Sequence, residues 1–310
     1  MQFNDQPKIG IQNIHSSLLD HHQLSLDMLR VDEIHPLISG NKWFKLKYNL
    51  LRAREEGHHT LLTFGGAFSN HIFATAAAGM EYGFKTIGII RGEKTEPLNA
   101  TLTFASEQGM QLEYVGREAY REKSGPAFQE ALWQKYGRCY LLPEGGSNAL
   151  AVQGCAEILP QQHAYQYIAC CVGTGGTLAG ILEKNREQAV VMGFSALKGG
   201  GFLYEETNQL TQAYSGNIYQ NYRIVEDYHF GGYAKANAEL VEFINDFRQR
   251  HQVLLDPVYT GKMVYGIFDL LAKKFFSPGS RILAIHSGGL QGIKGFNERY
   301  QKKKYHIFID

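Results

Sequence analysis

Lys42 lies in a segment, Asn41-Lys42-Trp43-Phe44-Lys45, that opens an amphipathic stretch after Gly40. Asn41 is a favoured N-cap type, and apolar residues recur after it at helical spacing, which predicts a helix with Lys42 in its first turn. The positive potential at a helix start lowers the pKa of a lysine there, and burial lowers it further. Such a lysine has a free amine that can attack an aldehyde. Most lysines are instead solvated at the surface, so other segments must support this interpretation.

A glycine-rich turn, Gly173-Thr174-Gly175-Gly176-Thr177, lies between an apolar run and a predicted helix over 178–184. Its N–H groups can point into one concavity, where the helix start adds positive potential and the hydroxyls can donate hydrogen bonds. A Walker loop would need Gly-Lys-Ser/Thr, and a dinucleotide site would need a glycine where Leu178 stands and an acidic residue after strand 190–194. The turn therefore favours a lone phosphate, such as that of pyridoxal 5'-phosphate, whose aldehyde would form a Schiff base with Lys42. The alternative is a turn that binds nothing.

Two further predicted helix starts carry hydroxyl groups. Ser69 could donate a hydrogen bond to a substrate carboxylate, together with N–H groups of the first helical turn, or it could simply cap the helix. Thr260, in the segment Asp256 to Lys262, could cap the next helix or face the pyridine nitrogen of the cofactor. Tyr259 could supply a phenol for proton transfer.

These segments together resemble the fold-type II family of pyridoxal-phosphate enzymes, specifically the aminocyclopropane-carboxylate deaminase and D-cysteine desulfhydrase group. The similarity covers about residues 30–289, and the motifs follow in the order of the family. They are Gly40-Asn41-Lys42 with Lys45-Leu46, Ser69-Asn70-His71, Gly145 to Leu150, the phosphate turn, Asp256 to Lys262, and His286-Ser287-Gly288-Gly289.

The resemblance implies a role for each matching residue. Lys42 would hold the cofactor covalently, Asn70 would bond its 3'-oxygen, and Thr260 would face its pyridine nitrogen. Tyr259 would lie beside the reacting carbon, and Tyr233 resembles the second active-site tyrosine of the family. The phosphate would be bound by Gly173, Thr174, Gly175, Gly176 and Thr177, and the substrate would be contacted by Ser69, Asn70, His71 and Ser287.

Three positions separate the two activities of the group. Deaminases have Gln, Glu and Leu where this chain has His71, Thr260 and Ser287, which resemble the desulfhydrase side. A neutral threonine makes the pyridine ring a weaker electron sink, which is adequate when a proton leaves Cα and a thiolate leaves Cβ. The expected reaction is α,β-elimination from a small β-substituted amino acid, with D-cysteine giving pyruvate, ammonia and sulfide. The alternatives are aminocyclopropane-carboxylate deamination, D-serine dehydration or racemisation, and a catalytically silent protein that binds an amino acid or a phosphate ligand.

From about residue 59, short apolar runs alternate with helical patterns, which predicts an α/β fold with parallel sheets flanked by helices. The resemblance implies two domains of the tryptophan synthase β-like type, with a large cofactor-binding domain at 1–45 and 151–310 and a small domain at 46–150. Further predictions are helices over 150–159, 234–250 and 262–276, and a flexible loop over 198–202.

Composition narrows the class of partner. The chain has 310 residues, 44% of them hydrophobic, so it can bury a large core. A formal net charge of +1 without a long basic run gives no electrostatic footprint for nucleic acid or an anionic membrane. We expect a cytoplasmic protein, because the sequence shows no bilayer-spanning apolar stretch and no signal peptide. The four cysteines lack metal-ligand spacing and are expected to be buried thiols, so no metal is predicted. The expected partners are a small amino-acid substrate and, from the resemblance, a second copy in a homodimer.

Overall fold

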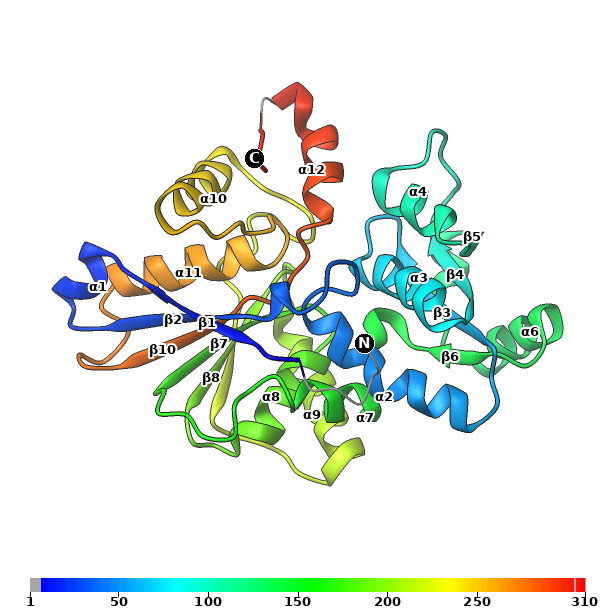
Figure 1. Ribbon diagram of the computed structural model, residues 1–310, viewed down its shortest axis with the longest axis horizontal. Helices are drawn as coiled ribbons and strands as arrows, with labels where there is room; N and C mark the ends of the chain where they lie inside the picture. The colour runs from blue at the N-terminus through cyan, green and yellow to red at the C-terminus, as the bar shows by residue number, and fades with distance from the viewer. Residues whose placement is uncertain (1–6, 304, 310) are drawn as a thin grey trace.

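The computed structural model describes residues 7–303 and 305–309, which form two sheets flanked by helices (Figure 1). The larger sheet has six strands in the order β1 (Gly10–Ile14), β2 (Ser25–Arg30), β10 (Arg281–Ile285), β7 (Tyr167–Val172), β8 (Val190–Ser195) and β9 (Tyr222–Val225). The smaller has four strands in the order β5 (Gln111–Val115), β4 (Lys85–Arg91), β3 (Thr60–Gly66) and β6 (Tyr140–Leu142). All neighbouring strands in these sheets are parallel except β1 and β2.

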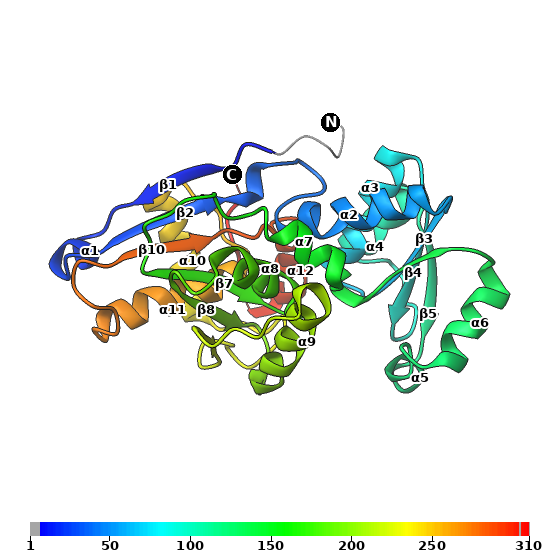
Figure 2. The same ribbon diagram turned by 90° about the horizontal axis from the view of Figure 1, so that it is seen from below.

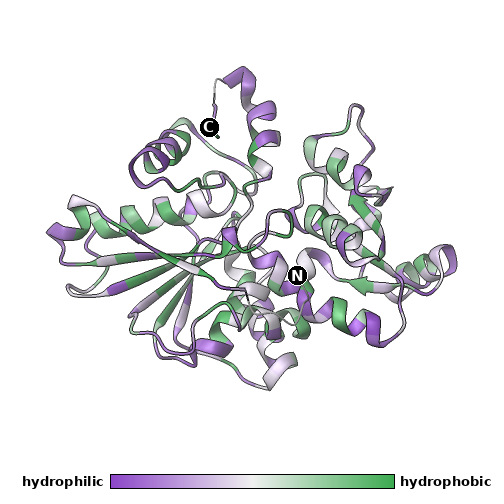
Figure 3. Cartoon of the chain, viewed as in Figure 1, coloured by the Kyte–Doolittle hydropathy of each residue, from purple (hydrophilic) through white to green (hydrophobic). Residues whose placement is uncertain are grey.

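Helices cover both faces of the larger sheet, because alternate residues of each strand point to opposite sides. On β7, Ile168 and Cys170 join the core with α7 (Ala149–Cys155), α8 (Gly176–Asn185) and α9 (Leu203–Ser215). Ala169 and Cys171 join the core with α1 (Ser17–His21), α10 (Ala238–His251), α11 (Thr260–Ala272) and α12 (Gly292–Tyr300). Figure 2 shows these two helical layers, and Figure 3 shows the hydrophobic residues concentrated on the strands between them.

The smaller sheet is built in the same way. One face packs against α3 (Asn70–Tyr82) and α4 (Ala100–Glu107), and the other against α5 (Arg117–Arg121) and α6 (Pro126–Tyr136). Between the two sheets runs α2 (Asn41–Glu55), whose buried Trp43, Phe44, Leu46 and Leu50 share one core with residues of both sheets. The predicted domain boundary at residue 46 falls inside this helix, which contacts both sheets. The boundary therefore stays a prediction.

The structure confirms the α/β class and corrects several local predictions. The helix predicted over 150–159 ends at Cys155, the one over 234–250 begins at Ala238 after an Asn237 cap, and the one over 262–276 is Thr260–Ala272. The predicted loop 198–202 contains a 3-10 turn, η3 (Gly200–Phe202). Further 3-10 turns are η1 (Val31–Glu33), η2 (Glu144–Gly146) and η4 (Gln301–Lys303).

The sequence does not predict strands β1, β2 and β9 or helices α1, α5, α9 and α12. The four residues of β9 are too few to show a period, and β1, α1 and β2 precede the region in which strands and helices alternate. All four cysteines are buried and free, as expected. In the described part of the chain, none of the helices has both the length and the apolar character that a membrane crossing requires.

Candidate active site

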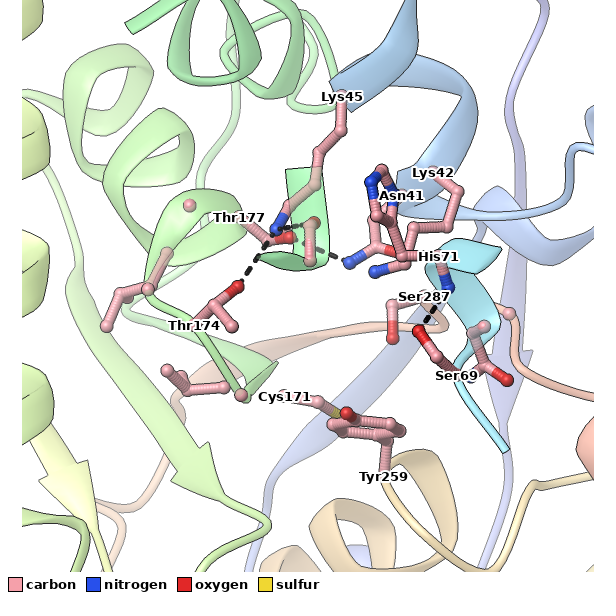
Figure 4. Close-up of a pocket in the computed structure, with 18 of the residues that line it drawn as sticks. Asn41, Lys42, Lys45, Ser69, His71, Cys171, Thr174, Thr177, Tyr259 and Ser287 are labelled. Atoms are coloured by element: carbon pink, nitrogen blue, oxygen red, sulfur yellow. Dashed lines mark hydrogen bonds between the residues drawn. The ribbon is translucent and has the colours of Figure 1, made fainter. Parts of the chain in front are cut away.

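A pocket lies where the C-terminal ends of β3, β7 and β10 meet the starts of α2, α3 and α8 (Figure 4). This edge is where parallel α/β sheets bind ligands, because strand ends and helix N-termini converge there. The structure brings together nearly all of the predicted site residues. Those that line the pocket are Lys42, Ser69, Asn70, His71, Gly173, Thr174, Gly175, Gly176, Thr177, Tyr233, Tyr259 and Ser287.

Lys42 lies in the first turn of α2, as predicted, but the predicted N-cap Asn41 is wrong. The cap is Gly40 at φ +67°, and a Cβ there would lie 2.0 Å from the carbonyl oxygen of Ser287. Only glycine allows this approach of backbone to backbone, which places Lys42 beside the end of β10. The side chain of Asn41 instead donates to the Thr177 hydroxyl at 2.8 Å and so ties α2 to α8.

The amine of Lys42 is suited to nucleophilic attack. Burial, and next the charge of Lys45, lower the pKa of Lys42 from its ordinary value to about 7. No hydrogen bond or ion pair joins the Lys42 amine to any other residue in ranges 7–303 and 305–309. At neutral pH a large fraction of this amine is therefore unprotonated and available to an aldehyde.

Lys45 is a site residue to which sequence reasoning assigned no role. One turn after Lys42, it is buried, and its Nζ donates to the Gly145 carbonyl at 3.0 Å, the Ser147 hydroxyl at 2.8 Å and the Thr174 hydroxyl at 3.4 Å. All three partners are neutral, and no carboxylate pairs with the Lys45 amine within residues 7–303 and 305–309. Burial lowers the pKa of Lys45 to about 8. Its place in the lysine motif, three residues after Lys42, was the only signal available in the sequence.

The glycine turn forms the wall of the pocket beside the Lys45 amine. Gly175 caps α8 in the left-handed region at φ +74°. A Cβ on Gly176 would lie 2.6 Å from the Ser147 hydroxyl and 3.1 Å from the Lys45 amine, so the lack of a side chain keeps the helix start open. The hydroxyls of Ser147 and Thr174 are 2.6 Å apart on the same side. An anion at this turn would therefore meet the two hydroxyls, the buried Lys45 ammonium group and the N-terminus of α8.

These features fit pyridoxal 5'-phosphate on physical grounds. An unbalanced ammonium group, on Lys45, faces a glycine turn, which matches a phosphate group. An amine with a lowered pKa, on Lys42, lines the same pocket, which matches an aldehyde. Lys262 offers no such match, because its amine donates to the carbonyl oxygens of His229 and Gly232 at 2.8 and 2.9 Å, outside the pocket.

Ser69 and His71 face the turn from the start of α3. The Ser69 hydroxyl oxygen caps the helix by accepting from the N–H groups of His71 and Ile72 at 3.2 and 3.3 Å. Those two N–H groups are thus already engaged, contrary to the prediction that they are free for a carboxylate. The Ser69 proton can still be donated, so the capping and the binding interpretations are compatible.

His71 is buried and neutral. Burial, and then the charges of Lys42 and Lys45, hold the pKa of His71 well below its ordinary value. The Thr63 hydroxyl gives its proton to the Leu142 carbonyl at 3.0 Å, so it must accept from the His71 Nε2 at 2.9 Å. The other ring nitrogen, Nδ1, keeps its lone pair and has no hydrogen-bond partner among the described residues. It is a buried acceptor that lies beside Gly146, where a Cβ would come within 3.1 Å of it.

Two tyrosines line the side of the pocket nearest α11. Tyr259 and Tyr233 make an edge-to-face contact with ring centroids 6.1 Å apart. Burial is the main cause that raises the pKa of Tyr259 well above its ordinary value. Desolvation of the phenol also raises the pKa of Tyr233, although this residue remains 39% exposed. Both hydroxyls therefore carry their protons at neutral pH and can act as donors.

Thr260 does not line the pocket with the others. It is fully buried, its hydroxyl donates to Asp256 Oδ1 at 2.7 Å, and it accepts from the Asp256 N–H at 2.9 Å. The Asp256 carboxylate also accepts the N–H groups of Val258, Tyr259 and Thr260 at 2.8 to 3.0 Å. With its proton directed at a carboxylate, the Thr260 hydroxyl can meet a ring nitrogen only through a remaining lone pair, as an acceptor.

The similarity of this chain to known proteins agrees with the geometry. It is 30% identical to a mitochondrial bifunctional D-cysteine desulfhydrase/1-aminocyclopropane-1-carboxylate deaminase of Arabidopsis thaliana, over 83% of this chain and 70% of that protein. It is 29% identical to a D-cysteine desulfhydrase of Klebsiella pneumoniae, over 90% and 91%. A solved structure of an ACC deaminase homologue superposes with a TM-score of 0.82 at 26% identity and covers 97% of this chain and 95% of that one. The model of the family described as "Pyridoxal-phosphate dependent enzyme" matches residues 22–288, so the chain belongs to that family.

Proposed function

We propose that this protein, a pyridoxal-phosphate dependent lyase, catalyses α,β-elimination from D-cysteine to give pyruvate, ammonia and sulfide. The observation that carries the proposal is the position of His71 and Ser287. Both resemble the desulfhydrase side of the family, both are neutral groups, and both line the pocket that contains Lys42. The relatives named for the desulfhydrase and for the deaminase support elimination or deamination of a small amino acid.

The residues of the pocket divide the work of this reaction. The cofactor, when bound, supplies the electron sink that stabilises a carbanion at Cα. Lys42 has the free amine that can take the Cα proton, and the Ser69 hydroxyl can donate to the substrate carboxylate. Tyr259 and Tyr233, whose phenols are protonated, can give a proton to the departing thiolate.

The division of the chain into a large unit, 1–45 and 151–310, and a small unit, 46–150, is part of this proposal. It is supported by the two separate sheets, with the pocket at the residues that join them. Assembly as a homodimer is a further part of it and rests on the family resemblance. Sedimentation equilibrium of the purified protein tests the dimer.

The role of the glycine turn is tested with a pair of substitutions at one position. Gly175→Asp should weaken pyridoxal 5'-phosphate binding at least about tenfold more than Gly175→Asn, because the two side chains have nearly the same shape and only aspartate repels a phosphate. Asparagine also tolerates the positive φ of this residue. Cofactor affinity is measured by fluorescence titration, with thermal unfolding as the check on folding. Equal affinities of the two folded variants would place the phosphate elsewhere.

Substrate preference is expected to favour D-cysteine over aminocyclopropane-carboxylate by about 100-fold or more in kcat/KM. Sulfide and ammonia release from the unmutated protein measure it directly. Ser287→Leu should narrow the gap, because it makes the pocket wall more apolar beside Lys42. Thr260→Glu is unsuitable for this test, since it would bury a second carboxylate against Asp256. Ammonia from aminocyclopropane-carboxylate without sulfide from D-cysteine would contradict the proposal and favour the deaminase.

A further inference from the structure

A second, smaller pocket adjoins the active site. Asn70, Tyr233 and Tyr259 line both pockets, so the two share a wall that contains a predicted substrate-binding residue and both tyrosines. The second pocket lies between Phe68, which directly precedes Ser69, and helix α12. The second pocket therefore lies directly behind the two tyrosines as seen from the first.

The wall of this second pocket is suited to an apolar group. Two of its polar groups are engaged already, since the Asp256 carboxylate accepts three backbone N–H groups and the Tyr300 hydroxyl donates to the Ala234 carbonyl at 3.1 Å. The other polar groups include the Asn70 amide, on the wall shared with the first pocket, and the Arg299 guanidinium, which lies over the Tyr300 ring. The remaining wall is mainly aromatic, aliphatic or glycine surface. It is formed by Phe68, Pro257, Val258, Phe296, Gly289, Gly292 and Gly295.

The glycines on the α12 side keep this space open. A Cβ on Gly292 would have only the Asn70 Oδ1 near it, at 3.7 Å, so a side chain there would extend into the pocket without a backbone clash. A Cβ on Gly295 would touch the ring of Phe68 at 3.3 Å. Phe68 itself is 38% exposed and lies against Gly295 of α12.

We propose that the second pocket receives a short apolar group on the sulfur of the substrate, so that S-alkyl and S-allyl cysteines are substrates of this enzyme. The inference rests on the proposed elimination. The reaction uses one water: the proton leaves Cα, the Cβ–S bond breaks with its electron pair on sulfur, and the thiolate is protonated to a thiol. The aminoacrylate that remains is hydrolysed to pyruvate and ammonia. Burial of the alkyl group in the second pocket favours the substituted substrate over D-cysteine itself.

The test compares S-allyl-D-cysteine with D-cysteine, with pyruvate as the common product. In the unmutated enzyme, kcat/KM for the allyl substrate should equal or exceed that for D-cysteine. Gly292→Leu fills the second pocket and should lower kcat/KM for the allyl substrate at least about tenfold, while D-cysteine changes less than about twofold. Lys294→Leu, at an exposed position of the same helix, is the matched control and should change neither value.

A binding measurement without turnover accompanies the kinetics. N-acetyl-S-allyl-D-cysteine cannot react, because its nitrogen is acylated. Saturation-transfer NMR then reports which protons of this ligand contact the protein, without any turnover. The allyl protons should receive saturation in the unmutated protein and lose it in Gly292→Leu. No transfer from the unmutated protein to the allyl protons would overturn the inference, even if the variant does not fold.

The kinetic outcomes separate this inference from the proposed function. The inference would be overturned if D-cysteine gives pyruvate but kcat/KM for the allyl substrate is more than about tenfold lower than kcat/KM for D-cysteine. The proposed function would still stand. An equal loss on both substrates in Gly292→Leu would also overturn the inference. Pyruvate from neither substrate would overturn both.

Discussion

Replacement of Lys42 by alanine is expected to abolish covalent attachment of pyridoxal 5'-phosphate and to lower the elimination rate by roughly a thousandfold or more. Lys42 combines a pKa lowered to about 7 with a position in the pocket lining and has no competing partner in the described ranges. Alanine removes both the amine that bonds the aldehyde and the base near Cα. Borohydride reduction followed by peptide mapping locates the bond.

Lys45 provides the matched control. Lys45→Gln keeps a polar side chain of similar reach but removes the charge beside the glycine turn, so it should weaken cofactor affinity while leaving the covalent bond on Lys42. A reduced cofactor found on Lys45 or Lys262 in the unmutated protein would show that the assignment of Lys42 is wrong.

The pH dependence of attachment tests the lowered pKa of Lys42. Only the neutral amine attacks an aldehyde, so the attachment rate should rise as pH increases through about 7, the lowered pKa of Lys42, and then level off. An ordinary lysine would still be gaining rate at much higher pH. Because the charge of Lys45 contributes to this lowering, Lys45→Gln should move the midpoint upward. A midpoint that stays in place would remove Lys45 as a cause.

Replacement of Asp256 by alanine should have the largest effect on stability, a loss of about 3–5 kcal/mol in the free energy of unfolding. The Asp256 carboxylate is buried and accepts hydrogen bonds from three consecutive N–H groups, those of Val258, Tyr259 and Thr260, and from the Thr260 hydroxyl. Alanine leaves all four donors without this acceptor, and the two from Thr260 are buried. Because these bonds also fix the backbone of Tyr259, elimination should fall with stability.

Urea unfolding of three variants measures this effect. Asp256→Asn should lower the free energy of unfolding less than Asp256→Ala does, because the amide oxygen can still accept some of these hydrogen bonds. Some loss should remain, because the NH2 group of asparagine is a donor that faces other donors. Asp246→Ala is the exposed control: it removes a surface ion pair with Arg250, and the expected change is below about 1 kcal/mol. A loss for Asp256→Ala no larger than for Asp246→Ala would contradict the role given to this carboxylate.

The sequence by itself determined the α/β class, the lysine-bearing and glycine-bearing segments and the order of the motifs. These features are local: a glycine-rich turn after a buried strand, or a lysine in a first helical turn, follows from a few adjacent residues. Family resemblance then connected segments that no local rule links. For this reason most of the predicted site residues line a single pocket.

Only the tertiary structure decided which groups complete that pocket. Lys45 meets Gly145 and Thr174, which lie 100 and 129 residues away in the chain, and no spacing in the sequence expresses that meeting. Gly40 replaces Asn41 as the helix cap because the backbone at Ser287, two residues after the end of β10, lies too close to Gly40 for a side chain. The tautomer of His71 depends on the direction of the hydrogen bonds at Thr63, which requires the Leu142 carbonyl to be in place. The space beside α12 likewise depends on distant segments. Contacts between such segments form only when the chain folds.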